Sequence, residues 1–508
     1  MSYPATESST SGPFVCLSDL HLGADISVLS YHSKEDFTFR CERQSQCLKM
    51  FVQSLRNYIP RVFDGKTPVL VLNGDCLDFD FASPAQLIHA FQCFMRAAFD
   101  PNEEPLFASE VIYIPGNHDH RLWEQMKDQL MVRNIKQSNA IPERVQYQST
   151  RLFDEEGIAS FLLNEMIRMA DLPNVSISLR YPNWGLKRGD KRIVFHHGHY
   201  CEGIYRVMSR LTEILLDEEV IDVEELEAQN GGWVDFLWSS LGASEDQKNI
   251  MVWMYAMSLD PAASHHNYKR IARIISDYLD REYSVSATSK VAAGMSLEKL
   301  IVTLLNITFG KVFDAERAHF KEVLSDGAIE GVSWYLSGPI HRQLCTEEGL
   351  ELSASIDGDC RFVFGHTHKP FQAFLPVEGY SNNIGLYNSG GWSLDDVELT
   401  AVQGAAAIFI DEDFNIASLR LFNAPVNPRQ DIDKYDVRIE GMNTLEDEKN
   451  PLLYQMRSAL DNPECDALFR EFNRLAKQKA FEIVKYKQKG FFDPSLSPGI
   501  KKEKSYDI

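Results

Sequence analysis

Metal-binding and acid–base side chains gather in five short stretches of the sequence, each at the end of a hydrophobic run. These stretches read SDLHLG from Ser18, NGDCLD from Asn73, PGNHDH from Pro115, HHGH from His196 and GHTH from Gly365. They offer carboxylate, amide and imidazole donors but no thiolate pair, which suits Mn, Fe or Zn at five- or six-coordinate sites better than a structural zinc. The donors outnumber what one ion accepts. Two ions that share a carboxylate account for them economically, and such pairs cleave phosphate esters.

The elements that must position these residues are short strands separated by helices. Apolar, β-branched and aromatic runs begin at Phe14, Pro68, Glu110, Lys191, Arg361, Ile384, Ala405 and Ile416. Near-continuous hydrophobicity of this kind is typical of strands covered on both faces. Helical patterns over residues 43–58 and 84–99 separate the first of them, and this alternation predicts a layered α/β domain. Because open α/β sheets bind ligands beyond the carboxyl ends of their strands, we expect the polar stretches to meet there.

A different pattern fills the middle of the chain. Between Gly203 and Asp357 apolar residues recur at helical spacing, for example Ile271, Ile274 and Tyr278, which predicts a helical insertion. Beyond residue 425 the chain becomes helical and polar. We therefore expect a catalytic domain over residues 13–425, a helical insertion within it over 203–357, and a helical extension over 426–508.

The five stretches, in this order, resemble the signature of the calcineurin-like metallophosphoesterases: D-x-H, GD, GNH-D/E, H-G or H-x, and G-H-x-H. Any one block arises readily by chance, whereas all five in order, each at a strand end, are specific. The resemblance implies a four-layer αββα sandwich with two divalent metal ions, Mn²⁺ foremost and Fe or Zn as alternatives. It further implies that the chain is a hydrolase of phosphoesters or phosphoanhydrides.

The same resemblance implies a role for each donor. The first metal would be held by three side chains, those of Asp19, His21 and His368. The second would be held by those of Asn117, His197 and His366. The Asp75 carboxylate would bridge the two ions.

One histidine is expected to act on the substrate instead of binding metal. The resemblance implies that His118 serves as general acid, or stabilises charge on the phosphoryl oxygens, and that Asp119 orients it. His197 is chosen as the ligand of its block because it directly precedes the glycine. His196 then points to the other side of the strand, where we expect it to be packed.

Three further residues are candidates for contact with the substrate. His199 follows the metal-binding block and would lie behind the ligands or against the substrate, with ordinary loop polarity as the alternative. Arg206 and Arg210 are one helical turn apart at the start of the insertion, so together they could hold a distal phosphate. A solvated helix face is the alternative for this pair.

Charge and composition narrow the substrate and the setting. The formal net charge is −22, which repels nucleic acid at long range and favours a small or nucleotide-linked phosphorylated substrate. A nuclease acting on DNA or RNA and a non-catalytic scaffold stay as alternatives. No apolar run reaches the length of a membrane span, and the N-terminus does not resemble a signal peptide, so we expect a cytoplasmic protein. The cysteines form no CxxC pair.

Overall fold

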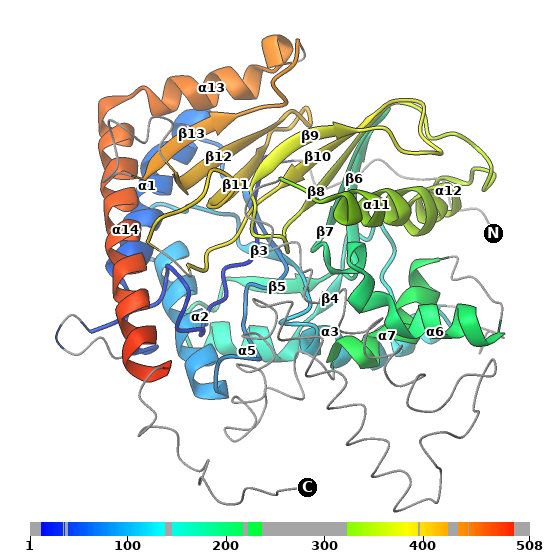
Figure 1. The fold of residues 1–508 in the computed structure, drawn as a ribbon, viewed down its shortest axis with the longest axis horizontal. Coiled ribbons are helices and arrows are strands. Elements are labelled where there is room, and N and C mark those ends of the chain that lie inside the picture. The colour runs from blue at the N-terminus through cyan, green and yellow to red at the C-terminus, as the bar shows by residue number, and fades with distance from the viewer. Residues whose placement is uncertain are drawn as a thin grey trace, which may run out of the picture.

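The computed structural model describes residues 12–33, 35, 39–137, 145–216, 222–235, 323–394, 397–424, 435–445 and 447–491. Two β-sheets stack face to face, and helices cover the outer face of each (Figure 1). The order of layers is therefore helices, large sheet, small sheet, helices. This confirms the predicted four-layer α/β sandwich.

The large sheet has eight strands in the order β13-β12-β11-β1-β2-β3-β5-β4. Their bounds are β1 Phe14–Leu17, β2 Val69–Asn73, β3 Glu110–Ile114, β4 Ile158–Ala159, β5 Ser176–Leu179, β11 Ala405–Ile410, β12 Ile416–Asn423 and β13 Asp436–Glu440. The pairs β1–β2, β2–β3 and β3–β5 are parallel, whereas β11, β12 and β13 join antiparallel. The parallel strands β1, β2 and β3 thus send their carboxyl ends to one edge.

The small sheet has five strands in the order β6-β7-β8-β10-β9. Their bounds are β6 Asn183–Arg188, β7 Lys191–His196, β8 Asp359–Phe364, β9 Phe371–Leu375 and β10 Ile384–Asn388. β7 and β8 are parallel neighbours although more than 160 residues of sequence separate them. This pairing places the end of β8, and the GHTH stretch after it, beside the end of β7.

The contact between the sheets is an apolar core built from alternate residues of their strands. Its members share full burial and point from either sheet toward the other; they include Cys16, Val71, Ile112, Phe195, Val363 and Ile408. The period of two that such a face requires explains why each strand also carries apolar residues for its outer, helix-covered side.

Helices α1 (Gln46–Val62), α2 (Pro84–Ala98), α5 (Phe161–Arg168), α13 (Pro451–Leu460) and α14 (Pro463–Phe491) cover the large sheet (Figure 1). Local chemistry sets the start of two of them. The Ser45 side chain accepts from the backbone of Leu48 at the start of α1, and Ser83 forms a capping box with Gln86 ahead of α2. The long helix α14 packs along α1, so the chain beyond residue 425 adds β13, α13 and α14 to this side.

The other outer layer comes from the two described ends of the predicted insertion. They contain η2 (Gly203–Arg206), α6 (Val207–Leu216), α7 (Val223–Asp235), α11 (Asp326–Tyr335), the π-helix η6 (Leu336–Ile340) and α12 (His341–Glu348), and η1 (His199–Cys201) lies just before them. Short helices α3 (Arg121–Glu124) and α4 (Lys127–Gln137) follow β3, and the 3-10 turn η7 spans Asp447–Lys449. The helical patterns predicted around Ile271 and Leu297 lie outside the described residues. Among those described, no helix has the length and apolarity to cross a bilayer.

Phe472 tests whether α14 is part of the core. Its ring is fully buried against Phe51, Trp392 and Phe422. Phe472→Ala should lower the free energy of unfolding by about 3–5 kcal/mol, because it leaves a cavity among aromatic rings. Phe481 lies on the same helix and is 47% exposed, so Phe481→Ala should cost no more than about 1 kcal/mol. Urea unfolding of the two variants measures the difference, and equal losses would contradict this packing.

Candidate metal centre

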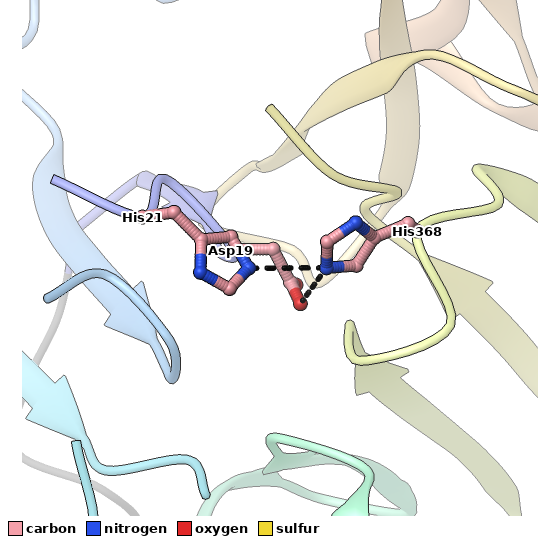
Figure 2. A group of neighbouring side chains, drawn as sticks. All are labelled: Asp19, His21 and His368. Carbon is pink, nitrogen blue, oxygen red and sulfur yellow. Dashed lines mark hydrogen bonds and ion pairs between the residues drawn. The ribbon is translucent and has the colours of Figure 1, made fainter. Parts of the chain in front are cut away.

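Asp19 and His21, just after β1, meet His368, just after β8 (Figure 2). His21 Nε2 lies 3.1 Å from His368 Nε2, which in turn lies 3.3 Å from Asp19 Oδ1. All three side chains are buried or nearly so. Two imidazole nitrogens and a carboxylate oxygen thus converge on one small region, as ligands of a single ion do.

Neighbouring groups hold these two rings in the orientation that a metal ligand needs. His21 Nδ1 contacts Asp78 Oδ2 at 2.9 Å, and His368 Nδ1 contacts Ser393 Oγ at 3.0 Å. In each ring the Nδ1 side is occupied, so the Nε2 lone pair faces the other donors. Partners of this kind fix the tautomer and orientation of metal-binding histidines.

A second cluster joins Asp75, after β2, to His197 and His366. His197 Nε2 lies 3.0 Å from Asp75 Oδ2, and its Nδ1 lies 3.2 Å from the carbonyl oxygen of Asn73. The backbone N–H of His366 donates to both Asp19 carboxylate oxygens, at 3.0 and 3.1 Å. That last contact ties the second cluster to the first.

Asn117 supplies a test of whether a metal fits here. Its side chain follows β3 and is buried, and its Oδ1 accepts no hydrogen bond within the described part of the chain. The next residue, His118, donates its backbone N–H to Asp75 Oδ1 at 2.8 Å, so this loop lies against the second cluster. A buried amide oxygen without a partner costs about 1–3 kcal/mol. A divalent ion would satisfy it, and the donor set of carboxylate, amide and imidazole fits such an ion.

The backbone at these positions is unusual. Asp19, His21, Asp75, His366 and His368 all have positive φ, between 45° and 68°. Residues with side chains adopt this left-handed region rarely, at a cost of about 1–3 kcal/mol each, and such strain clusters at functional sites. The sheet and loop contacts around them therefore hold each donor against its local preference.

Two glycines of the motif are required by close approach of side chains. A Cβ at Gly365 would lie 2.0 Å from Asp19 Oδ2, and one at Gly116 would lie 2.4 Å from Asp75 Oδ1. Both distances are far inside van der Waals contact. Any side chain at either position would displace a carboxylate of the centre.

His118 lies beside the two clusters with two carboxylates at its ring. Its Nδ1 is 2.8 Å from Asp80 Oδ2 and 3.5 Å from Asp78 Oδ1. Burial alone would lower the pKa of His118, but Asp75, Asp78 and Asp80 together raise it well above its ordinary value. These carboxylates favour the protonated form of the imidazole.

Asp119 has other partners than the ones expected from the sequence. Its carboxylate accepts hydrogen bonds from the Tyr113 hydroxyl and from the backbone N–H groups of Gly116 and Cys76, the last at 2.9 Å. Asp78 and Asp80 are the carboxylates that lie at the His118 ring, and Asp119 fixes the loops that follow β2 and β3. That Asp119 orients His118 stays a prediction.

A family model described as calcineurin-like phosphoesterase matches residues 12–287, more than half of the chain. The chain belongs to the calcineurin-like phosphoesterase family. No curated protein matches it. The matched range contains the first four motif blocks and ends before the fifth. The fold nevertheless brings His366 and His368 of that fifth block to donors of the first, second and fourth blocks.

His196 and His199 are buried beside the ligand block of the small sheet. His196 packs against Tyr335, with ring centroids 4.6 Å apart, on the side of the strand predicted for it. His199 is fully buried and its Nε2 lies 3.3 Å from the Tyr181 hydroxyl. Its ring centroid is 5.8 Å from that of His197, which favours a position behind the ligands. Burial lowers the pKa of His199 well below its usual value.

The two arginines at the start of the insertion also have other contacts. The Arg206 guanidinium lies 4.1 Å from the centre of the Trp334 ring. Arg210 points to the surface and pairs with Glu213 at 2.9 Å. Each arginine thus has a separate partner. That the two together hold a distal phosphate stays a prediction, which these contacts do not favour.

Sequence reasoning missed three groups at the centre: Asp78, Asp80 and Ser393. Asp78 and Asp80 follow Asp75 at spacings of three and five residues, and a second carboxylate so close to a proposed ligand was the available signal. Ser393 lies 25 residues beyond His368. No motif marks it.

Asp75 is the donor whose loss should affect both clusters. The family typically binds divalent metal ions, and Asp75→Asn should reduce the bound metal to less than half of the wild-type content, because an amide offers one weaker oxygen. Asp64→Asn is the matched control, since Asp64 is exposed and also has positive φ. Elemental analysis of protein purified without chelator measures the content. Wild-type metal content in Asp75→Asn would contradict a shared carboxylate.

Proposed function

We propose that the chain hydrolyses a phosphoester or phosphoanhydride in a small or nucleotide-linked substrate, with two divalent metal ions. The observation that carries this proposal is the meeting of two donor clusters, linked by the contact of the His366 backbone N–H with Asp19, beside a buried His118. Membership of the calcineurin-like phosphoesterase family supports the class of reaction.

In this proposal each cluster holds one ion. Asp19, His21 and His368 would hold the first, Asn117, His197 and His366 would hold the second, and Asp75 would be a ligand of both. When bound, such ions lower the pKa of a shared water and neutralise the phosphoryl oxygens. Mn²⁺ is our first choice, with Fe or Zn as alternatives, because the donors are oxygen and imidazole without thiolate.

His118 then provides the proton that the leaving oxygen needs. Asp78 and Asp80 lie at its Nδ1 side, so we assign the transfer to Nε2. Cys76 has no part as a nucleophile. It is fully buried, and burial raises the pKa of its thiol well above the usual value.

Two features support a small substrate over a nucleic acid. The insertion begins directly after Glu202, whose carboxylate lies 3.4 Å from His366 Nε2, and we infer that it narrows access on that side. The net charge of −22 disfavours encounters with polyanions.

A scaffold without activity is disfavoured because every motif donor is retained. All nine cysteines are free thiols, which suits a reducing compartment such as the cytoplasm.

His118→Gln should separate catalysis from metal binding. It removes the proton donor without removing a proposed ligand, so we expect turnover to fall by about 10²–10⁴-fold while metal content stays at the wild-type value. His89→Gln on the exposed face of α2 is the control. Steady-state hydrolysis of a chromogenic phosphodiester, with elemental analysis of the same samples, gives both quantities. Loss of metal in His118→Gln would make His118 a ligand and contradict the division of roles.

The substrate class is tested by a screen of the Mn²⁺-loaded protein. Nucleotides, dinucleotides and nucleotide-linked small molecules should include a compound that is cleaved, because the insertion narrows the site and the charge repels long polyanions. Efficient cleavage of long duplex DNA at physiological salt, with the small compounds untouched, would favour the nuclease instead.

A further inference from the structure

Glu227 is a fully buried carboxylate on α7, in the insertion, and within the described residues its polar partners belong to other elements. Its Oε1 lies 3.1 Å from His120 Nε2 and 3.1 Å from Lys127 Nζ. Its Oε2 accepts hydrogen bonds from the hydroxyls of Tyr181, at 3.0 Å, and of Tyr200. Glu227 thus joins the insertion to the core through a buried charge.

Two of these partners lie in the loops that carry proposed ligands of the second metal. His120 comes three residues after Asn117 and two after His118. Tyr200 comes three residues after His197, within η1. The Tyr181 hydroxyl also contacts His199 in that second loop. The Glu227 carboxylate therefore contacts the loop of Asn117 through His120 and the loop of His197 through Tyr200.

The cost of burying this charge argues for a specific role. An unpaired buried carboxylate is expensive, and apolar packing is often as stable as a buried ion pair. Burial alone would raise the pKa of Glu227, but His120, Lys127 and the Tyr200 hydroxyl lower it below its ordinary value. The carboxylate stays charged and directs its four partners.

The cluster of His120, Glu124 and Glu227 has the residue types of a metal site, but an ammonium group already lies within it. Lys127 Nζ is 2.6 Å from Glu124 Oε1 and 3.1 Å from Glu227 Oε1. We assign no ion to this cluster. Its contacts position neighbouring residues.

We propose that Glu227 is a positioning residue that couples the helical insertion to the second metal, by fixing the loops of Asn117 and His197 relative to each other. The inference rests on the proposed function, because it presumes that these loops bind an ion. Removing the charge would release both loops, and supporting partners of metal ligands typically contribute about 10–100-fold to metal affinity.

A matched control lies on the same helix. The Glu224 carboxylate also docks α7 onto the core, where it accepts from the backbone N–H groups of Tyr147 and Gln148 at 2.8 and 2.9 Å and from Ser149 Oγ at 2.8 Å. That loop carries no proposed ligand. Glu224→Gln therefore disturbs docking of the insertion without touching the ligand loops.

The test is calorimetric titration of metal-free wild type, Glu227→Gln and Glu224→Gln with Mn²⁺, with thermal unfolding and steady-state kinetics of each. We expect Glu227→Gln to weaken one of the two binding steps by about 10–100-fold and to leave the other unchanged. Its kcat should fall more than its KM changes, because the substrate still meets the first ion. Glu224→Gln should lower the unfolding temperature and leave both binding steps intact.

Unchanged binding steps in Glu227→Gln would overturn the inference, and so would an equal loss in Glu224→Gln, which would mark a general effect of docking. Should Glu227→Gln fail to fold, Tyr200→Phe decides. This substitution removes one hydrogen bond to Glu227 and keeps its charge. If both Mn²⁺ binding steps then match those of the wild type, the inference is overturned. A wild type that binds a single ion would instead sink the proposed function, and this inference with it.

Discussion

The position of the Asp75 carboxylate is the constraint on which the rest of the site depends. It must lie between the loop that follows β3 and His197 of the small sheet, and the two sheets fix it there. One of its oxygens accepts the backbone N–H of His118, and the other lies 3.0 Å from His197 Nε2. Burial opposes its charge, but His197 and His118 hold the pKa of Asp75 well below its usual value. The carboxylate can keep this position only because Gly116 has no side chain and because Asp75 itself accepts a left-handed backbone.

The two sheets explain how donors from distant parts of the sequence reach this point. Parallel pairing of β1, β2 and β3 aligns the residues that follow them, Asp19, Asp75 and Asn117, along one edge of the large sheet. Parallel pairing of β7 with β8 does the same for His197 and His366 in the small sheet. The apolar layer between the sheets then fixes one edge against the other. The donors can keep their strained, left-handed backbone because packing of this core stabilises the positions that they occupy.

Much of this could be predicted from the sequence, since the signals are local. Hydrophobic runs at Phe14, Glu110 and Lys191 become strands, and the motif blocks sit at their ends. Short strands such as β4 and β5 escaped prediction, because their few residues take their stability from neighbours in the sheet. The partners of His118 also escaped it: only the folded loop shows that Asp78 and Asp80 reach the ring and that Asp119 turns to Tyr113. Glu227 was equally hidden, because its four contacts come from three separate segments of the chain.

The central claim is that the two donor clusters hold two ions close enough to share Asp75. Electron paramagnetic resonance of the metal-free protein titrated with Mn²⁺ tests it directly, because neighbouring Mn²⁺ ions couple magnetically. The account predicts that the signal of isolated Mn²⁺ weakens as the second equivalent binds and that a coupled-pair spectrum replaces it. An isolated-ion spectrum that only grows in intensity through two bound equivalents would contradict it.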